Sequence, residues 1–176
     1  ILLGNTDINQ IDPQEIRKNI SFVPQEVSLF SGTIRQNITL GSPLKKDEDM
    51  LLASEIAGVS DFINKHPMGF DLDVGERGSN LSGGQRQGIG IARALFSGGE
   101  TLIFDEPTAS MDNTSEKIFV ENFLPFIKNK TLILITHKAS MLSLVDRIII
   151  LDKGKLITDG PKDKVLEMLS KNPRPK

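Results

Sequence analysis

The sequence contains no cysteine, and its other absences narrow the range of functions further. Without cysteine, neither a disulfide framework nor a thiolate metal site can form, and the chain fits a reducing compartment. No apolar run reaches the roughly 20 residues that a membrane-spanning helix needs, and no segment resembles a signal peptide. The formal net charge of -2 gives no general attraction to nucleic acid or to anionic membranes.

One further absence is a phosphate-binding loop. The chain has no Gly-x-x-x-x-Gly-Lys-Ser/Thr run, which cradles the β- and γ-phosphates of a nucleotide. Gly154 and Lys155 are adjacent, but Leu156 follows them and no glycine stands at the required earlier position. The chain also starts with the apolar residues 1–3, which resemble the end of a strand. We therefore expect a fragment that is cut at its front.

What the sequence does contain is enough apolar residues for a folded core, because 38% of its 176 residues are hydrophobic. Apolar, β-prone runs alternate with segments of helical spacing, and this pattern predicts an α/β fold with a largely parallel sheet. The second and third expected strands are almost wholly apolar, as is typical of parallel strands buried on both faces. We expect strands at 20–23, 101–104 and 131–135, helices at 47–57, 82–96 and 113–125, and a hairpin of 147–151 with 155–158.

Polar side chains mark the starts of two expected helices. Ser82 and Gln85 have the spacing of a capping box, in which each side chain bonds the backbone of the other residue. By the same spacing we expect Asn113 to cap the next helix together with Glu116.

Other local signals fill in the remaining segments. Gly88 and Gly90 each cost a helix about 1 kcal/mol relative to alanine, so we expect close packing at these two positions. The stretch 67–80 is rich in glycine and charge and is expected to be loop, and residues 171–176 are expected to be a frayed tail. Pro161 suits the first turn of a last helix, on which three apolar residues would share a face: Val165, Leu166 and Leu169.

Two adjacent carboxylates, Asp105 and Glu106, follow the apolar run 101–104. A carboxylate at the end of a buried strand holds Mg²⁺, directly or through water, in nucleotide hydrolases. The second carboxylate can then take a proton from an attacking water as general base. Taken alone, an acidic turn after a strand is also common in α/β proteins.

A small hydroxyl and two glycines stand at the start of the helix expected at 82–96, in the run Leu81-Ser82-Gly83-Gly84-Gln85-Arg86-Gln87. A helix N-terminus carries free N–H groups and a partial positive charge. Two glycines let an anion approach the backbone, so phosphate is a natural ligand. Ser-Gly-Gly alone would be an ordinary helix cap, but the full run ahead of Asp105 and Glu106 favours a phosphate site.

Two more polar side chains follow expected strands. His137 comes just after the run 131–135, at the sheet edge where α/β proteins place functional groups. Gln25 follows the run 20–23, and its neutral amide can reach a metal ion or a water. A lone histidine there is more often structural, and a lone glutamine would be a turn residue. Beside the two motifs above, we expect His137 to contact a γ-phosphate.

Together these residues resemble the nucleotide-binding domain of ABC transporters, over nearly all of the chain. The matching motifs occur in the family's order: Gln25 as the Q-loop, 81–85 as the signature, 103–106 as the Walker B strand, 110–112 as the D-loop and His137 as the switch histidine. The resemblance implies a P-loop NTPase (RecA-like) core with a mostly parallel sheet, plus an α-helical signature subdomain, with the N-terminal part missing. It assigns 1–25 and 98–170 to the core, 26–97 to the signature subdomain and 171–176 to a tail.

Two further stretches resemble exporters. Residues 29–38 resemble the segment after the Q-loop in exporters, and residues 74–78 resemble the exporter X-loop, which lies beside the coupling helices of the membrane domain. Three less specific stretches, at 111–116, 136–142 and 144–147, resemble type I secretion exporters, which move repeat-rich toxins, proteases or adhesins.

The sequence departs from the family pattern at three points. The Walker A loop, the aromatic residue that stacks on adenine and the strand between them lie outside the chain. Gly88 stands where many members have a larger residue, and Met111 stands where leucine is commoner. Without a Walker A lysine, we expect this chain alone to show no ATPase activity and weak or no ATP binding. The helix that normally follows that loop and packs on the sheet is missing too, so we expect exposed apolar strand faces.

The resemblance also implies a mechanism. Two such domains enclose two ATP molecules with Mg²⁺ head to tail, and Walker A of one faces the signature of the other. At the chain's own nucleotide, the resemblance implies that Asp105 binds the metal, Glu106 activates the water, His137 contacts the γ-phosphate and Gln25 senses metal and water. The partner's nucleotide would be contacted by Ser82, Gly83, Gly84 and Gln85. Asp112 would couple the two sites, and Glu76 would pass closure to membrane helices.

The implied function is ATP hydrolysis that drives export of a protein across the bacterial inner membrane. The implied partners are a second nucleotide-binding domain, the transmembrane domain of the same chain, a periplasmic adaptor and an outer-membrane channel, but no nucleic acid. The domain would lie at the cytoplasmic face of the inner membrane, as part of an integral membrane protein.

Three alternatives stay open. A soluble ABC ATPase that acts on nucleic acid or the ribosome would lack the two exporter stretches, and the net charge of -2 without a basic stripe argues against it. An exporter of lipids, drugs or peptides is separated only weakly, because the membrane domain chooses the substrate. A noncatalytic module, whose signature helix serves a partner's ATP, would not need Glu106 and His137.

Overall fold

The computed structural model describes residues 1–40 and 46–171. The chain divides into two compact units, Ile1–His137 and Lys138–Lys176. Of the tail predicted at 171–176, Lys171 ends a helix, and the other positions lie outside the described residues. The boundaries predicted between core and signature subdomain stay predictions.

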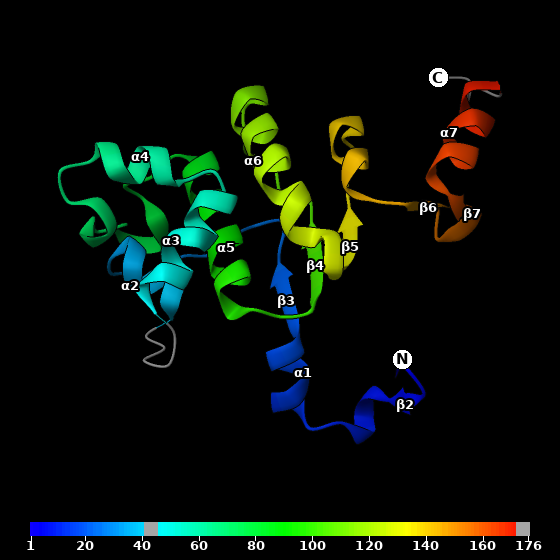
Figure 1. Ribbon diagram of the computed structural model, residues 1–176, viewed down its shortest axis with the longest axis horizontal. Coiled ribbons are helices and arrows are strands. Elements are labelled where there is room, and N and C mark those ends of the chain that lie inside the picture. Colours follow the sequence, from blue (N-terminus) through cyan, green and yellow to red (C-terminus); the bar gives the residue numbers. More distant parts are fainter. Residues whose placement is uncertain (41–45, 172–176) are drawn as a thin grey trace. The chain divides into compact units, whose positions relative to one another are not determined.

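A parallel three-stranded sheet in the first unit confirms the predicted α/β fold (Figure 1). Within the sheet Val23 pairs with Phe104, and Asp105 pairs with Ile135, so all three strands end at one edge. The residues that follow the three strands therefore come out near one another at this edge. The order is β3-β4-β5, with β3 at Ile20–Val23, β4 at Thr101–Asp105 and β5 at Thr131–Ile135.

One face of this sheet is covered and the other is open. On the covered face the Phe104 ring stacks on Phe123 of helix α6 (Asn113–Phe126), with 5.3 Å between ring centroids. On the open face Phe22 is 56% exposed and Ile133 is 49% exposed. The prediction that β5 is buried on both faces is wrong, because the helices in the described part of this unit leave its second face open.

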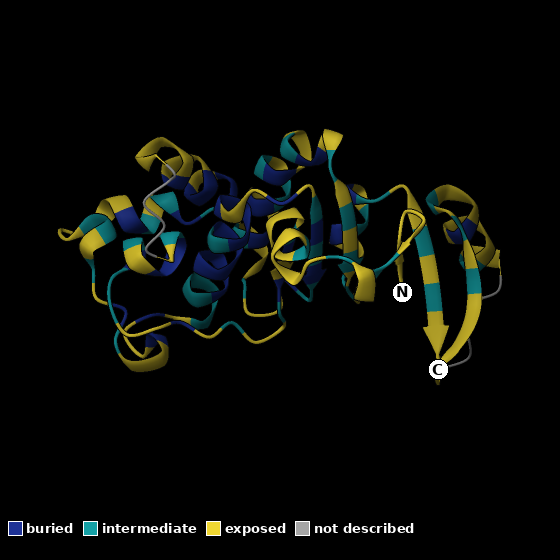
Figure 2. Cartoon of the chain, turned by 90° about the horizontal axis from the view of Figure 1, so that it is seen from below, coloured by how far each residue is buried: buried dark blue, intermediate teal, exposed yellow. Residues whose placement is uncertain are grey.

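Helix α5 (Gly83–Ser97) packs against β3 and against helices α2 (Ile34–Thr39) and α3 (Asp47–Ile56). Figure 2 shows it as mostly buried. A Cβ atom at Gly88 would lie 2.2 Å from a Val59 methyl, and one at Gly90 would lie 2.6 Å from both Val27 methyls. Close packing at the two glycines is thus confirmed, because each makes room for a valine from another segment.

Short elements complete the first unit. The predicted loop at 67–80 is irregular apart from two 3-10 turns and an isolated bridge between Asp73 and Thr33. None of the helices within the described residues combines the length and the apolar character that crossing a membrane requires. The short elements are β1 (Leu2–Leu3), β2 (Thr6–Asp7), η1 (Ile8–Gln10), α1 (Pro13–Asn19), α4 (Ser60–Lys65), η2 (Gly69–Asp71), η3 (Glu76–Gly78) and η4 (Ile127–Asn129).

The cap of α6 differs from the prediction. Asp112, not Asn113, is the N-cap, and its carboxylate accepts the backbone N–H of Ser115 at 2.7 Å. The Glu116 carboxylate accepts the Thr108 hydroxyl at 2.7 Å instead of reaching back to the cap. A carboxylate at the first position outside the helix faces its free N–H groups, so aspartate takes the role and the helix begins at Asn113.

The second unit contains the predicted hairpin, formed by β6 (Arg147–Asp152) and β7 (Lys155–Pro161). Pro161 is the last residue of β7 and does not open the final helix, because the backbone N–H of Lys162 first bonds the Asp146 carbonyl oxygen at 2.8 Å. The helix α7 covers Lys162–Lys171. Of its three predicted apolar residues, Val165 is buried, Leu169 is half-buried and Leu166 is exposed.

Candidate active site

Glu106 stands just past the end of β4 in an unusual backbone conformation. Its φ of 45° is left-handed, which costs a non-glycine residue about 1–2 kcal/mol. Two hydrogen bonds hold this conformation: the Glu106 N–H donates to the Ile135 carbonyl oxygen at 2.9 Å, and the Gln87 side-chain amide donates to the Glu106 carbonyl oxygen at 3.3 Å. The sheet and helix α5 therefore fix the direction in which the Glu106 side chain leaves the chain.

The carboxylate of Glu106 meets the residues that follow β5. One of its oxygens, Oε1, lies 2.7 Å from His137 Nδ1, and the other lies 3.5 Å from the Thr136 hydroxyl oxygen. The Glu106 side chain is 15% exposed, whereas the His137 ring is 76% exposed. The sequence-predicted residues Glu106 and His137 are thus in direct contact, and the imidazole links a shielded carboxylate to the surface.

Asp105 is the last residue of β4 and is half-buried. It shares the open face of the sheet with Ile103, two positions before it. Gln25, which follows the neighbouring strand β3 after Pro24, is exposed near the same edge. These residues would offer a metal ion one or two carboxylates and an amide oxygen.

This donor set fits Mg²⁺ that arrives with a nucleotide. Mg²⁺ usually keeps several waters and takes one or two carboxylates together with substrate phosphates, so it needs no closed protein cage. Within the described residues, no group of three or more His, Cys, Asp or Glu side chains gathers in a way that could hold a metal by itself. The donors at this edge therefore suit a metal ion whose other ligands are phosphate oxygens and waters.

Gln25 and the start of α5 line one open hollow of about 310 Å³. Residues 25–27 form part of its wall, and the rest is formed by Gly83, Arg86 and Gln87 of α5 together with Ser110. The hollow thus brings the predicted Q-loop residue, the signature and the D-loop next to one another. Ser110 and Gln87 were not among the predicted site residues, and a buried glutamine in an otherwise apolar helix face is the signal that points to Gln87.

The predicted capping box at the start of α5 is present. The Ser82 hydroxyl accepts the Gln85 N–H at 3.2 Å, and the Gln85 side-chain oxygen accepts the Ser82 N–H at 2.9 Å. A Cβ atom at Gly84 would lie 3.1 Å from the Ser110 carbonyl oxygen. Gly84 therefore also makes room for the main chain at Ser110 and Met111, a packing role that the phosphate argument did not include.

Asp112, the predicted coupling residue, is exposed and caps α6. The backbone N–H of Ser115 stabilises its charged form and holds the pKa of this carboxyl below its ordinary value. The carboxylate is thus ionised at neutral pH and already partly satisfied within its own chain.

Comparison with known proteins places these motifs in context. The family model described as ABC transporter matches residues 1–109. A protein of Rickettsia bellii named as an export ATP-binding/permease protein is 41% identical over 160 residues, which cover 91% of this chain and 28% of that protein. The leukotoxin export ATP-binding protein LtxB of Aggregatibacter actinomycetemcomitans is 39% identical over 167 residues, which cover 95% of this chain and 24% of that protein.

A solved structure is also similar to most of this chain. A bacterial Atm1-family ABC exporter with ATP bound superposes with a TM-score of 0.87 at 33% identity, over 96% of this chain and 29% of that one. The chain spans about a quarter of the length of the curated relatives that it matches.

Proposed function

The chain belongs to the ABC transporter family, and on that premise we propose that it binds and hydrolyses ATP as part of an exporter in a bacterial inner membrane. The observation that carries the proposal is the 2.7 Å contact between Glu106 Oε1 and His137 Nδ1 at the carboxyl edge of the parallel sheet. A fixed carboxylate beside a solvent-facing imidazole suits the activation of a water next to a terminal phosphate.

Each residue of the site has its own proposed role in ATP hydrolysis. Glu106 takes the proton of the attacking water, and its fixed backbone aims the carboxylate. His137 holds that carboxylate and contacts the γ-phosphate, where negative charge develops. Asp105 and Gln25 would hold Mg²⁺, directly or through water. Mg²⁺ supplies neutralisation of phosphate charge when it is bound.

Two domains have to meet for the site to be complete. Because this chain holds no Gly-x-x-x-x-Gly-Lys-Ser/Thr run, a loop of that kind has to come from elsewhere in the full-length protein. We assign the N-terminus of α5, with Ser82, Gly83, Gly84 and Gln85, to the nucleotide of a second, head-to-tail domain, and Asp112 to coupling between the two sites. The other partner is the transmembrane domain of the full-length protein, and we assign this nucleotide-binding domain to the cytoplasmic face of the inner membrane.

The cargo we propose is a protein, exported by a type I secretion mechanism with a periplasmic adaptor and an outer-membrane channel. The support is that relatives named for leukotoxin export match 95% of this chain at 39% identity. Export of a lipid, drug or peptide is the second candidate, because a relative whose name gives export without a cargo matches 91% of this chain at 41% identity.

ATP turnover of two chains tests the proposed function: these 176 residues, and a longer chain of the same protein that includes its phosphate-binding loop. We expect turnover only in the longer chain, and near-complete loss with Glu106→Gln while ATP binding is kept. Wild-type turnover in Glu106→Gln would reject Glu106 as the base. Turnover by the 176 residues alone would show that other groups hold the nucleotide.

A further inference from the structure

One guanidinium fixes the segment that follows Gln25 onto helix α5. Arg93 donates from Nη1 to the Ser28 carbonyl oxygen at 3.0 Å, from Nε to the Asn37 carbonyl oxygen at 2.8 Å and from Nη2 to Asn37 Oδ1 at 3.0 Å. Its guanidinium carbon also lies 5.2 Å from the centroid of the Phe30 ring. The three bonds leave in different directions, which the fork of an arginine allows and a lysine ammonium cannot reproduce.

The Asn37 side chain bonds the same segment, and we call Arg93 and Asn37, with their bonds to this segment, the clamp. Asn37 is 1% exposed, and its Oδ1 accepts both the Arg93 donor and the Phe30 N–H at 2.8 Å. Its Nδ2 donates to the carbonyl oxygens of Phe30 at 2.8 Å and Thr33 at 3.1 Å. A buried amide with all four bonds made holds the main chain between Phe30 and Thr33 in one conformation.

The same segment also packs against α5 at a position nearer to Gln25. Val27 fills the space beside Gly90 of α5, where a Cβ atom would meet both valine methyls. Val27 and Gln25 line the same hollow as Gln87, whose amide bonds the Glu106 carbonyl oxygen. Gln25 is therefore held between β3, whose last residue Val23 pairs with Phe104, and the Val27–Thr33 main chain, which packs against α5.

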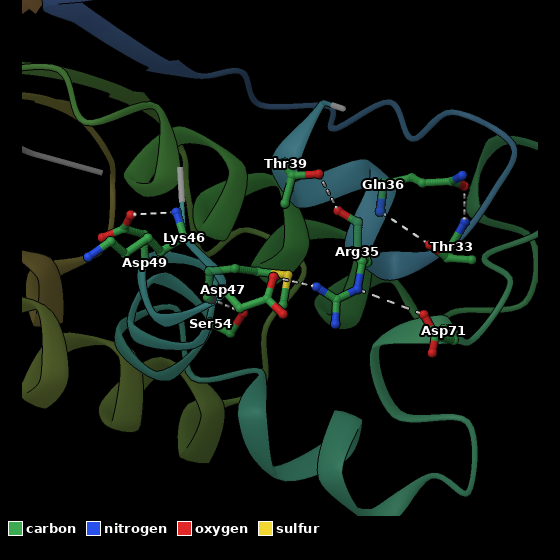
Figure 3. Close-up of polar contacts among 10 residues, drawn as sticks. Thr33, Arg35, Gln36, Thr39, Lys46, Asp47, Asp49, Ser54 and Asp71 are labelled. Carbon is green, nitrogen blue, oxygen red and sulfur yellow. Dashed lines mark hydrogen bonds and ion pairs between the residues drawn. The ribbon is translucent and has the colours of Figure 1, made fainter. Parts of the chain in front are cut away.

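Backbone hydrogen bonds join this segment to Leu72 and to the second stretch that resembles exporters, residues 74–78. The Ile34 N–H donates to the Leu72 carbonyl oxygen at 3.0 Å, and the Val74 N–H donates to the Gly32 carbonyl oxygen at 2.9 Å. Figure 3 shows Arg35 reaching from α2 toward Asp47 and Asp71, at 2.7 Å and 3.8 Å. The two stretches that resemble exporters thus form one unit, and Arg93 ties this unit to α5.

We propose that Arg93 is a positioning residue for the proposed ATPase, acting through Ser28, Asn37 and Val27 to place Gln25 beside the catalytic carboxylate. The proposal rests on the proposed function. The hydrogen bonds of Arg93 go to Ser28 and Asn37, which are not among the residues assigned to nucleotide or metal.

The test measures ATP turnover against ATP concentration in the full-length transporter, with Arg93→Met, Arg93→Lys and the matched control Arg35→Met. Arg35 is an arginine of the same region, but its ion pairs go to Asp47 and Asp71 and not to the segment that follows Gln25. We expect Arg93→Met to lower kcat roughly tenfold, with the KM for ATP within about twofold. Arg93→Lys should lower kcat about threefold, and Arg35→Met should stay within about twofold in both constants.

A double variant distinguishes a positioning role of Arg93 from a general loss of rigidity in the domain. In a Gln25→Ala background, a residue that acts through Gln25 has little left to lose, so Arg93→Met should then lower kcat by about twofold at most. Equal tenfold losses in both backgrounds would overturn the proposal, as would a KM that rises as kcat falls or an unchanged kcat in Arg93→Met. If neither Arg93 variant folds, as judged by thermal unfolding, the role is structural and the proposal is wrong. A wild-type protein without ATP turnover would overturn the proposed function, and this inference with it.

Discussion

Gln87 donates its side-chain amide to the main-chain carbonyl oxygen of Glu106 at 3.3 Å, and this bond ties helix α5 to the end of β4. Gln87 is 2% exposed, so the amide is shielded from water as well as bonded. The helix that begins with the signature and the strand that ends with the two carboxylates are therefore joined next to the proposed base.

The first prediction concerns this bond. Gln87→Met keeps the volume of the side chain but removes its donor, so the Glu106 carbonyl oxygen loses a partner. We expect the complete nucleotide-binding domain to lose about 1 kcal/mol of unfolding free energy in urea. We also expect the full-length protein to lose turnover roughly tenfold, because the carboxylate is no longer aimed. Gln14→Met, on the exposed surface of α1, is the control. Turnover within about twofold of wild type would contradict the aiming role.

His137→Ala separates a chemical role from a structural one. Because the ring is 76% exposed, we expect its loss to change the unfolding free energy by no more than about 0.5 kcal/mol. Turnover should nevertheless fall roughly a hundredfold, since the proposed contact with the γ-phosphate is lost. His66→Ala is the control, because His66 is exposed and its Nδ1 accepts only a nearby backbone N–H, that of Met68 at 3.2 Å. A stable His137→Ala protein with normal turnover would remove His137 from the mechanism.

The strand-end residues were predictable because their positions follow from apolar runs alone. The runs at 20–23, 101–104 and 131–135 end just before Gln25, Asp105 and His137, and parallel strands bring such ends to one edge. The capping box of Ser82 and Gln85 was also predictable, since it depends on a spacing of three residues. These signals are local or periodic.

The contacts that hold the site together were not predictable in the same way. Gln87 to Glu106, Gly84 against Ser110 and Arg93 to Ser28 join residues from different elements, and no spacing rule reports such pairs. The Asn113 cap was wrong for a related reason. Both Asp112 and Asn113 can cap a helix; in the structure the Asp112 carboxylate accepts the Ser115 N–H, and the Glu116 carboxylate bonds Thr108.

Gly90 gives a prediction about packing. Gly90→Ala places a methyl where the Val27 methyls lie, and we expect it to cost about 1–3 kcal/mol of unfolding free energy. In a Val27→Ala background the clash is relieved, so the same change should cost at least about 0.5 kcal/mol less. Urea unfolding of the four proteins in this cycle measures the difference. Additive losses would show that the two side chains do not meet.

The cap of α6 predicts a dependence on pH. The pKa of Asp112 in the folded protein lies below its ordinary value of 3.8, so its stabilising effect is complete above that pH and is lost as the pH falls through the lower folded value. Asp112→Ala should therefore lower the urea midpoint at pH 7, and the gap to wild type should shrink as the pH falls below about 4. Asn113→Ala should leave the midpoint nearly unchanged at every pH. A larger effect of Asn113→Ala would restore the cap predicted from the sequence.

The open face of the sheet predicts how these 176 residues behave by themselves. Ile133 and Ile135 are 49% and 50% exposed on β5, and an uncovered apolar strand face favours self-association. Replacing both with threonine keeps a β-branched side chain suited to a strand but removes apolar surface. We expect the double variant to sediment as a smaller species than wild type at equal concentration. Threonine at the inward-facing Leu132 and Leu134 is the matched control and should destabilise the fold without reducing association, because these side chains lie on the covered face. Equal association of wild type and the Ile133→Thr, Ile135→Thr protein would place the adhesive surface elsewhere.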